Sequence, residues 1–138
     1  MPPRSVAGFS GSQNGMTDAQ KIVVKRELEF VTEFHHGDCV GADSEVHDIA
    51  RQSRWCWIEA HPTNIEGKRA FTSADFVHAV KPPIERNHDI VDVSKRLIAT
   101  PGEMHEVLRS GTWATIRYAV RVGIPVLIVY PDGTEEKR

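Results

Sequence analysis

Arg109-Ser-Gly-Thr-Trp-Ala-Thr-Ile-Arg-Tyr-Ala119 is a helix-forming stretch with an apolar segment on either side. The flanking segments, residues 96–100 and 126–130, have the length and apolar character of buried strands. Trp113, Ile116 and Val120 lie at helical spacing and predict the buried face of the helix. The order strand, helix, strand predicts a parallel βαβ unit.

The first turn of this helix is suited to an anion. Ser110, Gly111 and Thr112 lie where free backbone N–H groups and the positive end of the helix dipole converge. Gly111 lets a ligand approach the backbone, and the two hydroxyl groups can add hydrogen bonds. We therefore expect a phosphate-bearing, nucleotide-like ligand at this position.

The same order of elements extends through the rest of the chain. Thr17 and Gln20 have the spacing of a capping box at a helix start. We expect strands at residues 5–9, 32–36, 55–60, 96–100 and 126–130, and helices after Thr17, after Gly41, at 84–94 and at 112–122. This pattern predicts one domain over residues 1–138, an α/β doubly wound, mainly parallel five-stranded Rossmann-like sheet with helices on both faces. Ligands of such sheets bind at the carboxyl ends of the strands, where the strand order reverses.

Two segments do not fit the pattern. Residues 63–83 are irregular, and we expect a long loop or lid there, with a short helix over residues 73–80. Lys68 and Arg69 belong to this loop and would close over a ligand. The charged residues 132–138 predict a solvated tail.

The composition favours a soluble globular protein without a broad basic surface. The formal net charge of the 138 residues is −2, which gives no support for nucleic-acid or anionic-membrane binding. Two cysteines fit a reduced intracellular protein, and we find neither a signal peptide nor a membrane-spanning apolar run. We expect a cytoplasmic homo-oligomer that requires no cofactor and holds a bound nucleotide-type ligand.

Two earlier loops have composition suited to ligand binding. The loop at residues 8–13 is glycine-rich but matches neither a P-loop nor a dinucleotide fingerprint, so a tight strand-to-helix turn explains it equally well. In the loop at residues 36–43, Asp43 either interacts with its own helix N-terminus or accepts a hydrogen bond from a ribose hydroxyl. Nearby metal-ligating side chains match no zinc spacing, and we expect no metal site from them: His35, His36, Asp38, Cys39 and His47.

Four segments together resemble the SLOG superfamily, the Rossmann-like group that includes the DNA-processing protein DprA (Smf) and the LOG-type phosphoribohydrolases. The segments are Gly8-Phe-Ser-Gly-Ser12, His36-Gly-Asp-Cys-Val-Gly-Ala-Asp43, Glu85-Arg-Asn87 and Arg109-Ser-Gly-Thr-Trp-Ala-Thr115. They occur in the order found in the family and cover nearly the whole chain. The resemblance implies loops that bind a nucleotide, a nucleotide-sugar or an ADP-ribose-like ligand.

The resemblance also raises the question of catalysis. Arg86 matches the arginine that LOG enzymes use near the scissile N-glycosidic bond. These enzymes carry a glutamate shortly after Gly-Thr, where this chain has Thr115. This difference favours binding over hydrolysis, although Arg86 and Asp43 would be the catalytic residues of a nucleotide N-glycosidic hydrolase. A DprA-like single-stranded DNA-binding protein is the further alternative.

The predicted ligand-binding residues come from all four segments and from two strand ends. They are Gly8, Ser10, Gly11, Ser12, Gln13, His36, Gly37, Gly41, Ala42, Asp43, Pro62, Arg86, Asn87, Thr100, Ser110, Gly111, Thr112 and Trp113.

Overall fold

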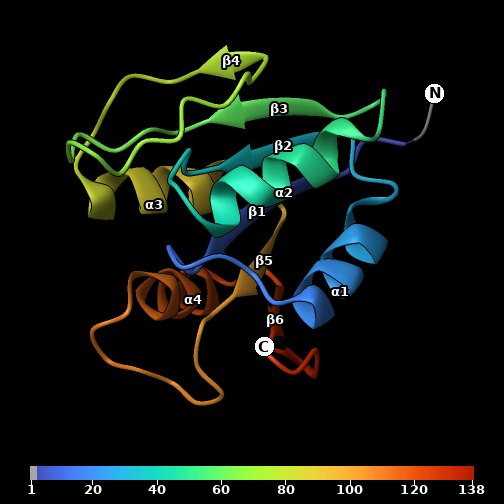
Figure 1. Ribbon diagram of the computed structural model, residues 1–138, viewed down its shortest axis with the longest axis vertical. Helices are drawn as coiled ribbons and strands as arrows, with labels where there is room; N and C mark the ends of the chain where they lie inside the picture. Colours follow the sequence, from blue (N-terminus) through green and yellow to red (C-terminus); the bar gives the residue numbers. More distant parts are fainter. Residues whose placement is uncertain (1–2) are drawn as a thin grey trace.

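A sheet of seven strands forms the middle layer of the protein (Figure 1). The structure is a computed structural model that describes residues 3–138. Its elements are β1 (Val6–Gly11), α1 (Asp18–Leu28), β2 (Glu33–His36), α2 (Ala42–Arg51), β3 (Trp57–Ala60), β4 (Phe76–Val77), α3 (Pro83–Val93), β5 (Arg96–Thr100), α4 (Gly111–Val122), β6 (Val126–Val129) and β7 (Glu135–Lys137). The strand order is β4-β3-β2-β1-β5-β6-β7, and only the β6–β7 pair is antiparallel.

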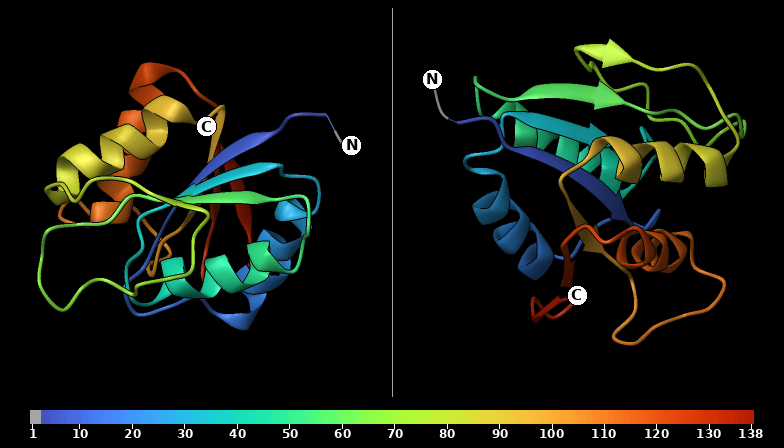
Figure 2. Two further views of the ribbon diagram at one scale, coloured as in Figure 1. Left: turned by 90° about the horizontal axis from the view of Figure 1, so that it is seen from above. Right: turned by 180° about the vertical axis from the view of Figure 1, so that it is seen from behind.

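Helices cover both faces of the sheet (Figure 2). Helices α1 and α2 pack together on one face, and α3 and α4 pack together on the other. Strand β5 shows the consequence for the sequence: Ile98 belongs to the core beneath α1 and α2, whereas Leu97 and Ala99 belong to the core beneath α4. A strand buried on both faces is apolar at consecutive positions, as expected for a parallel sheet.

The predicted capping box at the start of α1 is confirmed. The N–H of Gln20 donates to Thr17 Oγ1 at 3.1 Å, and the N–H of Thr17 donates to Gln20 Oε1 at 3.0 Å. The amide nitrogen of the buried Gln20 side chain also donates to the carbonyl oxygens of Pro101 and Val129. One side chain therefore caps α1 and ties it to the ends of two central strands.

The predicted number and direction of strands are wrong, although the α/β class holds. We predicted five mainly parallel strands, and the sheet has seven, with one antiparallel pair. The two additional strands lie at the edges of the sheet. An edge strand needs only backbone hydrogen bonds to one neighbour, and natural edges are short or charged. Strand β4, Phe-Val in sequence, is too short to show a pattern, and the charged strand β7 has no apolar pattern.

Each additional strand lies in a segment for which the sequence predicts another structure. Strand β4 has two residues, pairs with β3, and lies where we predicted a short helix over residues 73–80. Strand β7, Glu-Glu-Lys in sequence, pairs antiparallel with β6 and lies in the segment that we predicted to be a solvated tail. Within residues 3–138, none of the helices combines the length and apolar character needed to cross a membrane.

The order of the strands reverses at β1. From β1 the chain proceeds outward through β2 and β3 to β4, then crosses back by α3 to β5 on the other side of β1. The loops that follow β1 and β5 therefore leave their strands in opposite directions and open a crevice between them. The crevice lies at the carboxyl ends of the two strands.

Candidate ligand-binding pocket

A cavity of about 310 Å³ lies at this crevice. That volume is at the lower end of the range for small-molecule sites. Its walls come from the loops after β1, β2 and β5 and from the first turns of α3 and α4. The lining residues are Phe9, Ser10, Gly11, Ser12, Gln13, Gly37, Cys39, Asp43, Arg86, Asn87, Ile90, Gly102, Glu103, Val107, Arg109, Ser110, Gly111 and Thr112.

The first turn of α4 provides backbone donors at one wall. Ser110 is the N-cap, and its Oγ accepts a hydrogen bond from the N–H of Trp113 at 3.3 Å. The N–H groups of Gly111 and Thr112 have no protein acceptor in the described part of the chain. The first turn of α4 contains no acidic residue, so none of its own side chains offsets the helix dipole. Free donors and a positive dipole end thus face the cavity.

Arg86 provides a buried positive charge at another wall. It lies on the first turns of α3 and is 8% exposed. Its Nη1 donates to the carbonyl oxygens of Gly37 at 2.5 Å and His61 at 3.3 Å, and both terminal nitrogens lie 3.5 Å from Cys39 Sγ. Within residues 3–138, its Nε has no hydrogen-bond partner and no carboxylate forms an ion pair with it.

Asp43 lies close to this arginine, on the first turn of α2. Its Oδ2 accepts a hydrogen bond from the N–H of Cys39 at 3.1 Å. Burial raises the pKa of Asp43 to about 6, and the charge of Arg86 opposes that rise. A carboxyl group that titrates near neutral pH therefore lines the same cavity as a buried guanidinium.

Gly37 makes this arrangement possible. A Cβ at residue 37 would collide with Nη1 of Arg86 and would lie 2.8 Å from Oδ2 of Asp43. Only a glycine fits between the two charged side chains, which explains part of the glycine pattern in the loop after β2.

The long loop after β3 is fastened to this same loop. Backbone hydrogen bonds join Val40 N to the carbonyl of Lys68 at 2.9 Å and Ala70 N to the carbonyl of Asp38 at 2.7 Å. The Lys68 ammonium donates to Gln13 Oε1 at 2.8 Å, so Lys68 lies beside the pocket. Arg69 instead forms an ion pair with Asp38. The predicted closure of this loop over a ligand stays a prediction.

Most of the predicted ligand-binding residues line the cavity. They are Ser10, Gly11, Ser12, Gln13, Gly37, Asp43, Arg86, Asn87, Ser110, Gly111 and Thr112. The remaining predicted residues lie outside the lining: Gly8, His36, Gly41, Ala42, Pro62, Thr100 and Trp113.

Three of the residues outside the lining are buried, and their contacts with neighbouring side chains account for the residue types found there. Gly8 packs beneath Ser94 and Ile90 of the α3 face, and a Cβ there would lie 2.5 Å from Ser94 Oγ. His36 is buried against His47, with 3.0 Å between Nε2 and Nδ1. Trp113 is fully buried in the core.

Three of the other four pack against lining residues, and the fourth, Pro62, lies in the loop after β3. Gly41 has φ 92° and lies directly against the backbone of Gln13. Ala42 and Thr100 are buried close to Gly11, and Pro62 accepts a backbone hydrogen bond from Lys81. Gly41, Ala42 and Thr100 therefore lie directly behind lining residues of the pocket.

Sequence reasoning missed several lining residues in the segment between β5 and α4. Glu103 and Arg109 bring charge, and Val107 brings apolar surface. The Glu103 carboxylate accepts a hydrogen bond from Trp113 Nε1 at 3.1 Å. No local pattern marks these residues, because an irregular loop has no periodicity. Phe9 and Ile90 belong to segments that the sequence predicts as a strand and a helix, and Cys39 belongs to the set of side chains from which we expect no metal site.

Thr115 does not lie in the cavity lining. It is 2% exposed, and its Oγ1 donates to the carbonyl of Gly111 at 2.9 Å. The position at which the resemblance predicts a glutamate is therefore occupied by a hydroxyl bound within the helix. The carboxylates that do line the cavity are those of Asp43 and Glu103.

The fold and the position of the cavity define a Rossmann-like α/β protein with a pocket at the switch point of its sheet. No family model matches the chain, and no curated protein matches it. The structure is similar to that of the molybdenum cofactor binding protein from the phototrophic bacterium Rippkaea orientalis, with a TM-score of 0.69 and 14% sequence identity. The similarity covers 92% of this chain and 77% of the other. It shows the fold, and membership of the SLOG superfamily stays a prediction.

This comparison corrects one prediction. We expected that no cofactor is required, and the similar structure belongs to a protein that binds a molybdenum cofactor.

Proposed function

We propose that the protein binds a small phosphate-bearing ligand in the pocket between β1 and β5. The ligand is a nucleotide, a nucleotide-sugar or an ADP-ribose-like molecule, or a cofactor that carries a phosphate. Its phosphate would lie at the N–H groups of Gly111 and Thr112, with Arg86 on the opposite wall.

The surroundings of Arg86 are the observation that carries this proposal. Burying a guanidinium without a carboxylate partner is costly, because the charge loses its hydration. Arg86 is bound by carbonyl groups and a thiol, and its Nε lacks a partner in the part of the chain that the structure describes. Asp43 lies close by but forms no ion pair with Arg86, and its raised pKa leaves it only partly charged near neutral pH. An anion in the pocket would supply the opposite charge that Asp43 does not fully provide. The planar fork of arginine suits phosphate and carboxylate groups.

The rest of the pocket suits the remainder of such a ligand. Phe9, Ile90 and Val107 add apolar surface next to the polar loops. Nucleotides and the pterin of a molybdenum cofactor share the combination of a flat heterocycle and a phosphate. The two classes of ligand therefore make the same demand on this pocket and have to be distinguished by experiment.

A binding screen tests the proposal. The chain is titrated by calorimetry and thermal shift with AMP, ADP-ribose, NAD, a cyclic nucleotide and a molybdenum cofactor. A ligand present at 100 times its dissociation constant stabilises the fold by about 2.7 kcal/mol. Failure of every compound to stabilise the protein at millimolar concentration contradicts the proposal.

A matched pair of variants locates the site. Arg86→Lys keeps the charge and removes the planar fork, so we expect binding to weaken by about tenfold, or about 1.4 kcal/mol. Arg117→Lys is the control, because Arg117 lies on α4 outside the pocket lining and bonds to Glu106. Equal affinities of the two variants would place the ligand elsewhere.

A second candidate function is hydrolysis of the N-glycosidic bond of a nucleotide. The raised pKa of Asp43 favours it, because general acid–base catalysis works best with a group that titrates near the operating pH. Incubation with nucleoside monophosphates would then release free base, and Asp43→Asn would stop the release. Binding without any release of base leaves the ligand-binding proposal alone.

A further inference from the structure

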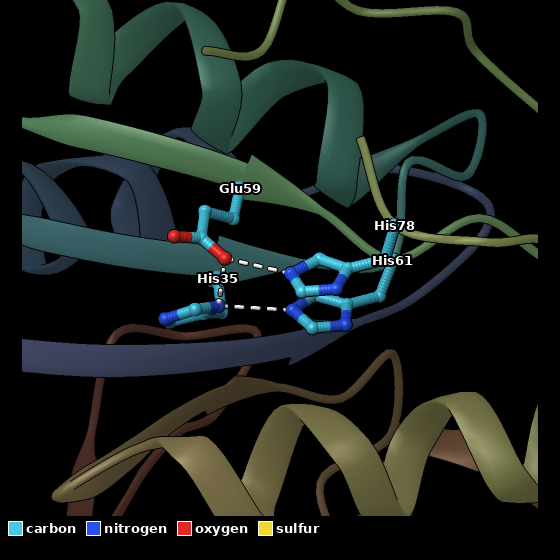
Figure 3. A group of neighbouring side chains, drawn as sticks. All are labelled: His35, Glu59, His61 and His78. Carbon is cyan, nitrogen blue, oxygen red and sulfur yellow. Dashed lines mark hydrogen bonds and ion pairs between the residues drawn. The ribbon is translucent and has the colours of Figure 1, made fainter. Parts of the chain in front are cut away.

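Three histidines and a glutamate converge on one face of the sheet, outside the pocket lining (Figure 3). They are His35 on β2, Glu59 on β3, His61 directly after β3 and His78 directly after β4. One side-chain donor atom from each residue lies within 4.8 Å of the donor atoms of all the others. His35 and His61 are buried, whereas Glu59 and His78 are partly exposed.

The pairing of the strands creates this cluster. His35 and Glu59 are direct partners across the parallel β2–β3 pair. Glu59 and His61 are two residues apart, so their side chains point to the same face. The N–H of His78 donates to the carbonyl of Ala60 at 2.9 Å, which continues the β3–β4 pairing beyond Val77. The residues are distant in sequence, and no spacing rule for metal sites identifies them.

We propose that His35, Glu59, His61 and His78 bind a divalent transition-metal ion of the Zn²⁺ type. Three imidazole nitrogens and one carboxylate oxygen form a four-ligand set that suits a tetrahedral site. Imidazole ligands favour zinc and its neighbours over Mg²⁺ and Ca²⁺, which prefer oxygen ligands. This proposal is independent of the ligand in the pocket.

A carboxylate behind His35 orients this ligand. His35 Nε2 lies 2.8 Å from Glu33 Oε2, and a carboxylate accepts, so Nε2 carries the hydrogen. The Nδ1 atom is then left with its lone pair, and it points toward His61 and Glu59 (Figure 3). Metal-binding histidines commonly have such a carboxylate on the second ring nitrogen. With Glu59, this carboxylate also offsets the charge of a divalent ion.

The distances leave room for an ion after small side-chain rotations. His35 Nδ1 lies 2.9 Å from His61 Nε2 and 3.9 Å from Glu59 Oε1, and His78 Nε2 lies 2.6 Å from Glu59 Oε1. Tetrahedral ligands at roughly 2.0–2.1 Å from zinc are roughly 3.3 Å apart. When the ion binds, the two short distances therefore open by about 0.4 and 0.7 Å, and the long one shortens by about 0.6 Å.

The ion would stabilise the edge of the sheet that β4 forms. Strand β4 has two residues and pairs with one neighbour, so few backbone hydrogen bonds hold it. A metal bound by His78 would link this edge and the preceding loop to β2 and β3. The backbone carbonyl of His61 also accepts a hydrogen bond from Arg86, so the metal site adjoins the pocket wall.

Cobalt binding tests the proposal on the untagged full chain after treatment with a chelator. We expect one equivalent of Co²⁺ to give the strong visible absorption of a tetrahedral site, and Zn²⁺ to displace it. Zn²⁺ should raise the melting temperature, whereas Mg²⁺ should not. Crystals grown with zinc should show one anomalous peak between the four side chains.

Three variants separate a metal site from a hydrogen-bonded cluster. His78→Gln and Glu59→Gln each remove a ligand from a partly exposed position and should weaken Co²⁺ binding by at least about tenfold, and Glu33→Gln by about tenfold to a hundredfold. His105→Gln is the control, because His105 is exposed and is not in the cluster. Far-ultraviolet circular dichroism shows whether each variant is folded. Absence of tetrahedral Co²⁺ binding by the wild-type chain, or unchanged binding by both ligand variants, overturns the proposal.

Discussion

Gly111 is a position at which the fold does not require glycine but a bound ligand would. A Cβ built at this residue meets no other atom within 4 Å, and its φ is not in the left-handed region. The protein itself therefore does not require glycine there. Because the residue lines the pocket at the free N–H groups of α4, a ligand gives the simplest reason for it.

Gly111→Ala should therefore affect binding and stability in opposite directions. We expect the free energy of unfolding to stay the same or to rise by about 0.4–1 kcal/mol, because alanine restricts the unfolded chain. Affinity for the ligand should fall by about tenfold or more, since the methyl group enters the space at the helix start. Urea denaturation and calorimetry measure the two effects. Undiminished affinity would show that the ligand does not approach this part of the backbone.

The raised pKa of Asp43 predicts how the stability of the fold depends on pH. Its folded pKa of about 6 lies above the ordinary value of 3.8, so between these values the folded state binds more protons than the unfolded state. Its contribution to the free energy of unfolding is therefore fully present below about pH 4 and is lost as the pH rises through about 6. A shift of about two units corresponds to roughly 3 kcal/mol at most.

The difference between wild type and Asp43→Asn isolates this effect. Buried His36, whose pKa is lowered to about 3 by burial, gives a slope of the opposite sign, and Arg86, Cys39 and Asp38 surround Asp43 in both proteins. Unfolding free energies measured from pH 4 to pH 7 should show the wild type losing stability relative to the variant. A difference that does not change with pH would contradict a raised pKa.

At the scale of elements, the start of α2 depends on one backbone conformation. Gly41 is the N-cap, with φ 92° and ψ −130°, and a Cβ there would collide with the carbonyl of Gln13. The N–H of Ala42 donates to the carbonyl of Ser12 at 2.9 Å. The loop after β1 and the first turn of α2 are thus held together through the backbone.

Gly41→Ala should destabilise the whole chain. Such a conformation costs a residue with a Cβ about 1–3 kcal/mol, and the collision adds to that cost. Gly111→Ala is the matched control, because it makes the same chemical change in open space with ordinary φ. Chemical denaturation of both variants gives the comparison. Equal stabilities would show that the loop rearranges without cost.

Over the whole molecule, the central elements were predictable from sequence, whereas the edges were not. Strand β5 has the predicted bounds, because its middle residues, Leu97, Ile98 and Ala99, form a continuous apolar run that is buried on both faces. Strands β4 and β7 form through backbone pairing with a neighbour; β4 is too short to show a pattern, and β7 is charged. The same distinction applies to the sites. Arg86 and Ser110 lie in recognisable motifs, whereas Glu103 and His78 reach their positions only through the tertiary fold.

The reversal of strand order at β1 also has a consequence for folding. The pocket walls come from residues 10–13 near the beginning of the chain and from residues 102–112 near its end. Bringing such distant segments together closes a long loop and costs chain entropy. A molecule bound there would contact both segments and so hold the N-terminal and C-terminal halves of the chain together. It would recognise only the fully closed sheet, and its release would precede or accompany the opening of β1 from β5.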